Sequence, residues 1–140
     1  MPILNLTADT RAELSDWLHS DTLLVACLCA AWCDVCCDYR ATFEQLAAQN
    51  PDSHFVWIDI EDQADLIGDI EVDNFPTLLM QRGPTVTFFG SVPPGQQVTH
   101  RLIQSQREQS TAQCAADALS STQRRLWQTQ CHIARRLGMD

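Results

Sequence analysis

The chain contains no lysine, so arginine supplies all nine of its permanently cationic side chains. It lacks an apolar run long enough to cross a bilayer, because the longest such stretch covers only residues 23–33. No basic segment followed by an apolar core and a cleavage site opens the chain, and no glycine-rich nucleotide or flavin fingerprint occurs in it. We therefore expect a cytoplasmic protein with no membrane span and no bound electron carrier.

The charge of the chain is divided unevenly along its length. Residues 1–80 carry 15 acidic side chains against two arginines, a net charge of −13, whereas residues 81–140 carry three against seven, a net charge of +4. An acidic surface repels phosphate groups, so the sequence argues against nucleic acid as a partner. A length of 140 residues suits one domain with a real core.

The seven cysteines are odd in number, and five of them crowd between Cys27 and Cys37. This clustering argues against a framework of structural disulfides and favours thiols that are kept reduced. Trp32 is followed by Cys33, Cys36 and Cys37, just after an apolar run and at the start of a helical pattern. The unpaired N–H groups of a helix start favour the thiolate, which is the attacking species in sulfur chemistry.

Apolar periodicity and turn residues predict the order of helices and strands. The continuous apolar run of residues 23–30 is typical of a central strand that is buried on both faces. The predicted strands are residues 3–6, 23–30, 54–60, 77–81 and 85–89, and the predicted helices are residues 7–20, 33–50, 63–69 and 96–107. The order is βαβαβαββα, with the last two strands forming a hairpin.

Four segments of the chain carry a recognisable pattern in register: Ala31-Trp32-Cys33-x-x-Cys36, then Phe75-Pro76-Thr77-Leu78-Leu79, Gly90, and Gly95-Gln96. In these matches the chain resembles the thioredoxin family. They cover residues 1–108, which we predict to be a thioredoxin-like domain, with residues 109–140 as a C-terminal helical extension. The resemblance implies an α/β fold with a central mixed sheet flanked by helices, and the extension, which the family does not explain, is expected to add a C-terminal helix.

The resemblance also implies roles for individual residues. Cys33 corresponds to the exposed attacking thiol, and Cys36 corresponds to the resolving thiol that forms the Cys33–Cys36 disulfide. Pro76 corresponds to the family's cis-proline, whose loop lies beside the attacking cysteine. Trp32 and Phe75 are expected to give an apolar flank to the substrate site.

The departures from the family pattern concern proton handling and charge. The acid that the family buries behind its active site falls at Cys27, and its lysine partner falls at Trp57. Resolution by Cys36 therefore depends on water or on Asp59, if that carboxylate reaches the site, and we expect it to be slow. Asp34 places a negative charge beside Cys33, which opposes the effect of the helix terminus.

The other nearby cysteines leave alternatives open. Cys37 competes with Cys36 for Cys33, links to another molecule, or takes no part. Cys27 and Cys29 are expected to be small core residues. A metal site is a minor alternative, in which Cys33, Cys36 and Cys37 hold zinc or copper(I) with a fourth ligand from Cys29 or a second chain.

The segment from residue 109 onward is rich in Gln, Ala, Ser and Arg and is predicted to be helical. We expect it to dock on its own domain, and a homodimer through this helix is the alternative. Its proposed apolar stripe includes two glutamines and is formed by Ala112, Ala116, Leu119, Gln123, Leu126, Gln130, Ile133 and Leu137. Trp127 and Cys131 widen the stripe, whereas Cys114 and Cys131 are expected to take no part in redox chemistry.

The sequence is compatible with two functions. The first is a redox-active thiol–disulfide oxidoreductase of cell redox homeostasis, which acts on protein disulfides or thiols and receives electrons from a separate reductase or a small thiol. The second is a thioredoxin-like binding or assembly module whose cysteines are regulatory or hold a metal. We expect the oxidoreductase to need no cofactor.

Overall fold

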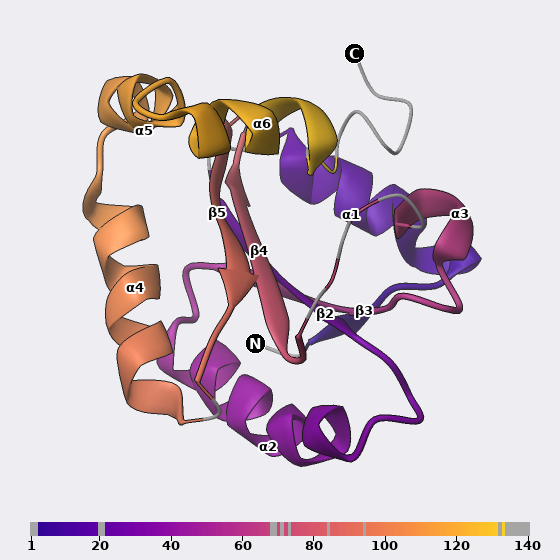
Figure 1. The fold of residues 1–140 in the computed structure, drawn as a ribbon. Coiled ribbons are helices and arrows are strands. Elements are labelled where there is room, and N and C mark those ends of the chain that lie inside the picture. The colour runs from indigo at the N-terminus through magenta and orange to yellow at the C-terminus, as the bar shows by residue number, and fades with distance from the viewer. Residues whose placement is uncertain are drawn as a thin grey trace.

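The computed structural model describes residues 3–19, 22–67, 70, 72, 74–83, 85–93, 95–131 and 133. The strands are β1 (Leu4–Asn5), β2 (Leu23–Cys29), β3 (His54–Asp59), β4 (Thr77–Arg82) and β5 (Thr85–Ser91). The helices are the 3₁₀ helix η1 (Ala8–Thr10) and α1 (Arg11–Leu18), α2 (Asp34–Gln49), α3 (Ala64–Ile67), α4 (Gln96–Glu108), α5 (Thr111–Ala118) and α6 (Thr122–Gln130). The predicted order βαβαβαββα is confirmed, and two helices follow it (Figure 1).

The five strands form one mixed sheet in the order β1-β3-β2-β4-β5. β1, β3 and β2 run parallel, whereas β4 is antiparallel to both β2 and β5. All seven residues of β2 are buried, as expected for a continuous apolar run in the centre of a sheet covered on both faces. The hairpin between β4 and β5 turns at Gly83, whose φ of 55° is a left-handed conformation that suits glycine.

Each face of the sheet is covered by helices, which creates two cores. Side chains of α1, α3 and α6 pack on one face, and side chains of α2 and α4 pack on the other. Figure 1 shows α2 and α4 on one side of the sheet and α1 and α3 on the opposite side. Because strand side chains alternate between faces, Cys27 and Cys29 of β2 both point toward α2.

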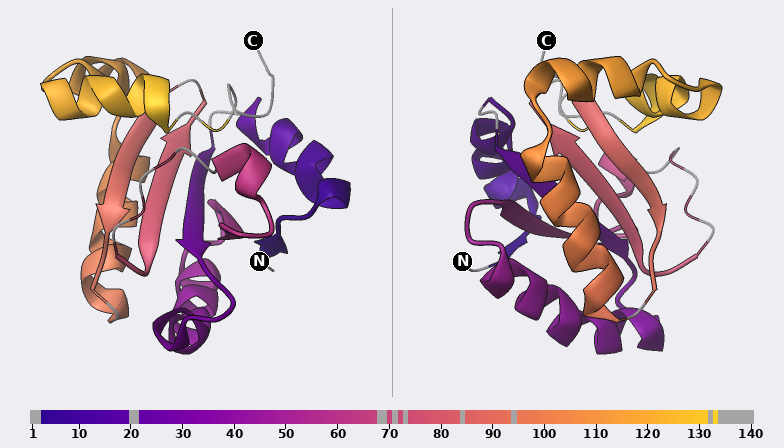
Figure 2. Two further views of the ribbon diagram at one scale, coloured as in Figure 1. Left: turned by 45° about the vertical axis from the view of Figure 1, so that its right-hand side comes forward. Right: turned by 90° about the vertical axis from the view of Figure 1, so that its left-hand side faces the viewer.

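Within its described residues the C-terminal segment forms the short helices α5 and α6 in place of one predicted helix, and α6 docks on its own sheet, as expected. The side chain of Gln128 in α6 pairs with the backbone of Val86 in β5, with both hydrogen bonds at 2.8 Å. The backbone N–H of Ile133 donates to the buried Gln81 Oε1 at 2.9 Å. Figure 2 shows α5 and α6 across one end of β4 and β5, away from the end toward which β2 points.

The two helices differ from the predicted stripe because the chain breaks between them. Ser121 is the N-cap of α6, and its hydroxyl accepts from the N–H of Arg124 at 3.1 Å. As a result Leu119 and Leu126, which the stripe placed inside, are 65% and 46% exposed, and Trp127 is buried instead. Leu137 of that stripe lies outside the described residues.

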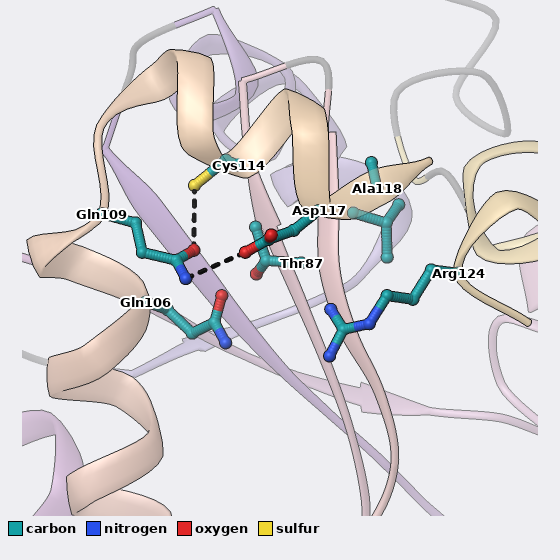
Figure 3. A pocket seen from close by; sticks show the side chains of 8 residues that line it. Thr87, Gln106, Gln109, Cys114, Asp117, Ala118 and Arg124 are labelled. Carbon is teal, nitrogen blue, oxygen red and sulfur yellow. Dashed lines mark hydrogen bonds between the residues drawn. The ribbon is translucent and has the colours of Figure 1, made fainter. Parts of the chain in front are cut away.

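A polar cluster joins α4, α5 and α6 beside β5 (Figure 3). The Gln109 side chain donates to Asp117 Oδ2 at 3.0 Å and accepts from the thiol of Cys114 at 3.5 Å. The crevice between these side chains is too narrow to hold a ligand. The cluster therefore explains how α5 is attached to the domain.

None of the helices that the described residues form is long and apolar enough to span a membrane.

Candidate functional site

The site lies where β2 ends and α2 begins, at the end of the sheet opposite α5 and α6. The loop after β2 turns tightly, because the N–H of Cys33 donates to the carbonyl oxygen of Ala30 at 3.1 Å. Cys33 is the N-cap of α2, and its carbonyl oxygen accepts from the N–H of Cys37 at 3.1 Å. Cys33 is therefore a partly exposed residue at the positive end of a 16-residue helix.

Cys36 is bonded to a different partner from the one that the family resemblance implies. The structure contains a Cys29–Cys36 disulfide, and Cys33 is a free thiol. The interpretation of Cys29 as a passive core residue is wrong, because Cys29 ends β2 on the face that α2 covers and so meets Cys36 in the first turn of that helix. The Cys33–Cys36 exchange pair stays a prediction.

Trp32 and Phe75 form an apolar surface beside this loop. Their rings meet edge to face with centroids 5.9 Å apart, and Trp32 is 68% exposed. The indole N–H of Trp32 donates to Glu61 Oε1, which orients the ring. The Phe75–Pro76 peptide bond is cis, as predicted. The structure thus brings Trp32, Phe75 and Pro76 together as expected, and their binding of substrate stays a prediction.

Cys27 and Trp57 are cross-strand neighbours in β2 and β3. Burial raises the pKa of the Cys27 thiol far above its ordinary value. Trp57 packs edge to face on Phe43 and lies 5.0 Å from the Arg40 guanidinium. Where the resemblance implies an acid and a lysine, the structure therefore has a neutral thiol and an indole.

Asp59 ties together the loops that follow β2 and β3. Its Oδ2 accepts from the N–H of Ala31 at 3.0 Å, and its Oδ1 accepts from the N–H groups of Glu61 and Asp62 at 2.9 and 3.0 Å. These bonds hold the chain just before Trp32. The role of Asp59 in proton transfer stays a prediction. Asp34 is exposed in the first turn of α2.

Cys37 is exposed, and its thiol lies 3.6 Å from the carbonyl oxygen of Ala31. A surface cavity of about 440 Å³ adjoins it and is also lined by Cys36, Arg40, Trp57 and Asp59. The Arg40 guanidinium in this cavity already donates one hydrogen bond, to Asn5 Oδ1 at 2.7 Å. The cavity gives a second approach to the region of Cys36, separate from the Trp32 and Phe75 surface.

Metal binding by the cysteine cluster gains no support from the geometry. Over the described part of the chain, His, Cys, Asp and Glu side chains nowhere gather in threes around a point that suits a metal ion. The disulfide takes both Cys29 and Cys36 out of any thiolate ligand set.

A family model named Thioredoxin matches residues 5–101, which is more than half of the chain. The chain belongs to the thioredoxin family. The match spans every element that positions the site, from β1 into α4. Comparison with curated proteins gave no match.

Solved thioredoxin structures share the fold at low sequence identity. Thioredoxin from Nicotiana alata is 21% identical, with a TM-score of 0.66, over 76% of this chain and 93% of that one. Thioredoxin from Fasciola hepatica is 20% identical, with a TM-score of 0.63, over 76% and 100%. The complex of ferredoxin–thioredoxin reductase with thioredoxin f2 contains a match at 16% identity and a TM-score of 0.64, over 76% and 96%. At identities this low, the likeness to these solved structures supports the fold alone.

The sequence interpretation missed Cys29 as the disulfide partner of Cys36. One signal was available: Cys29 has the same strand parity as Cys27, four residues before Cys33, so it points to the face that the following helix covers. The interpretation also missed Glu61, which lies in the loop after β3 and accepts from Trp32. No local pattern near Glu61 indicates this contact.

Proposed function

We propose that this thioredoxin-family protein is a thiol–disulfide oxidoreductase that exchanges a Cys33/Cys36 dithiol with disulfides of protein substrates. The observation that carries the proposal is the placement of Cys33 at the start of α2, directly after Trp32, whose exposed ring packs against Phe75 of the cis Phe75–Pro76 bond. A thiolate at a helix start next to an apolar surface suits attack on a protein disulfide.

The reaction has two displacement steps. The Cys33 thiolate attacks one sulfur of a substrate disulfide, which forms a mixed disulfide and releases the other substrate sulfur as a thiol. The Cys36 thiolate then attacks Cys33, which releases the second substrate thiol and leaves a Cys33–Cys36 disulfide. The substrate gains two electrons and the dithiol loses two. Cys36 must be a thiol for the second step, so the Cys29–Cys36 disulfide has to open first.

The electrons that reduce the protein come from outside the chain. We propose a separate reductase or a small thiol as the donor, since the sequence has no nucleotide fingerprint. The reductase complex among the structural neighbours supports a partner of this kind for the family. A reducing cytoplasm suits the five free cysteines. A homodimer through the C-terminal helix stays a prediction; α6 docks on its own sheet through Gln128 and Val86.

Insulin reduction with dithiothreitol tests this function. We expect Cys33→Ser to lower the rate of insulin precipitation to that of dithiothreitol alone, because Cys33 makes the first attack. Cys37→Ser is the matched control: Cys37 is exposed one helix turn later, and this variant should stay active. Activity that persists in Cys33→Ser would remove Cys33 from the mechanism.

A trapping experiment identifies the substrates. In Cys36→Ser the second displacement cannot occur, so substrates should stay bound to Cys33 through a mixed disulfide and be released by reductant. The double variant Cys33→Ser, Cys36→Ser should hold none.

A further inference from the structure

Cys29 and Cys36 are placed for a disulfide without any rearrangement of the backbone. Their Cα atoms lie 5.7 Å apart, within the usual range for bridged cysteines. Cys29 is fixed at the end of the central strand, and Cys36 is fixed in the first turn of α2. Neither residue lies in a loop, so the fold itself holds this pair together.

Cys36 is also within reach of Cys33. Cys33 caps α2 three residues before Cys36, and side chains at that spacing share a helix face. The two partners of Cys36 differ in exposure: Cys29 is fully buried, whereas Cys33 is partly exposed. Cys36 therefore lies between an interior sulfur and a surface sulfur.

We propose that Cys29 is a third redox-active cysteine, which exchanges with Cys33 for the sulfur of Cys36. This inference rests on the proposed function and adds an internal step to it. The Cys29 thiolate attacks Cys36 in the Cys33–Cys36 disulfide; the Cys29–Cys36 bond forms, the Cys33–Cys36 bond breaks, and Cys33 leaves as a thiolate. One disulfide replaces another, so no electrons enter or leave, and the proton of Cys29 is passed on to solvent or Cys33.

Cys27 lies where it can assist this step. Its sulfur is 3.7 Å from the Cys29 sulfur, within contact distance for a thiol hydrogen bond. Because burial raises the pKa of Cys27, it keeps its proton and can donate an S–H to a Cys29 thiolate. Cys27 is thus a positioning residue and not a further nucleophile.

The exchange has a consequence for the reaction cycle. With the disulfide held between Cys29 and Cys36, Cys33 is again a free thiol at the surface, although the protein is still oxidised. That form can attack a second substrate disulfide, but Cys36 is then not available to resolve the product. Substrates captured in this form should stay bound longer than substrates captured by the fully reduced protein.

Disulfide mapping of the oxidised protein tests the proposal. The reduced full-length protein is oxidised with glutathione disulfide, quenched in acid, alkylated with iodoacetamide and cleaved before aspartate. This cleavage separates residues 21–33, which hold Cys27, Cys29 and Cys33, from residues 34–37, which hold Cys36 and Cys37. Fragmentation of the linked peptides by mass spectrometry then shows which cysteine carries the bridge and which carries the label.

In the wild-type protein we expect the bridge on Cys29 and the iodoacetamide label on Cys33. In Cys29→Ala the bridge should move to Cys33, with loss of the label from Cys33. In the control Cys37→Ala the wild-type pattern should persist. Wild-type protein that carries the bridge on Cys33 and the label on Cys29 would overturn the proposal, and this result is read from the wild type alone, so it does not require a variant to fold.

The insulin assay separates this inference from the proposed function. If Cys33→Ser is inactive and the bridge is found only between Cys33 and Cys36, the oxidoreductase function stands and the role of Cys29 is refuted. If Cys33→Ser is as active as the wild type, the proposed function fails, whatever the mapping shows.

Discussion

At the scale of one residue, we expect His54 to make the free energy of unfolding depend on pH. It opens β3 and stacks on Trp17 of α1, with ring centroids 4.3 Å apart and planes at 9°. Burial lowers the pKa of His54 below its ordinary value. The unfolded chain, whose histidines titrate at about pH 6.5, therefore takes up this proton before the folded protein does as the pH falls.

We expect the free energy of unfolding to fall as the pH drops below about 6.5 toward the lower folded-state pKa of His54, and the contribution to be fully present above that range. His54→Phe keeps an aromatic ring on Trp17 and removes the titration. Urea unfolding at pH 7, 6 and 5 should therefore give a smaller loss of stability for His54→Phe than for the wild type. Equal losses in the two proteins would show that other groups cause the pH dependence.

At the scale of elements, packing against β5 determines which face of α6 is buried. Trp127 packs edge to face on Phe88 of β5 with ring centroids 6.1 Å apart, and the Arg124 guanidinium lies 5.3 Å from the indole. The neighbouring Leu126 points away from the sheet and is 46% exposed. Adjacent residues on a helix lie about 100° apart, so burying Trp127 leaves Leu126 outside.

Paired alanine substitutions test this orientation. Trp127→Ala removes a buried indole from the core, and we expect it to lower the free energy of unfolding by about 3 kcal/mol or more. Leu126→Ala is the control on the same helix and should change it by less than about 0.5 kcal/mol, since surface substitutions have small effects. Chemical denaturation measures both. A larger effect for Leu126→Ala would restore the predicted stripe.

At the scale of the whole molecule, the C-terminal segment and the sheet share one core. Trp127, Cys131 and Ile133 belong to the same buried cluster as the residues of β2, β3 and β4 on that face. Gln81 of β4 is fully buried and accepts the backbone N–H of Ile133. The division between residues 1–108 and 109–140 stays a prediction, which the cooperativity of unfolding can test.

We expect the full chain to unfold in one transition, because a shared core couples its parts. Cys27 in β2 and Cys131 after α6 are both buried cysteines outside the disulfide, and they report on the two segments. Pulsed alkylation across a guanidinium series, with reductant present, should expose both thiols at the same denaturant concentration. If Cys131 reacts at a clearly lower concentration than Cys27, the extension undocks on its own.

The sequence by itself determined the order of helices and strands, the family and the position of Cys33 at a helix start. These features depend on short-range patterns: apolar periodicity, turn residues, and a motif in which neighbours along the chain remain neighbours in space. The family resemblance supplied the pairing of Trp32 with the Phe75–Pro76 loop.

Only the tertiary structure decided which cysteine is the disulfide partner of Cys36, which face of α6 is buried, and which N–H groups donate hydrogen bonds to Asp59. Each of these outcomes depends on how one element is rotated and placed against another, since a strand parity or a helical stripe offers several faces and packing selects one. Cys29 and Leu126 show both directions of this selection: packing brought the cysteine into the site and left the leucine in solvent.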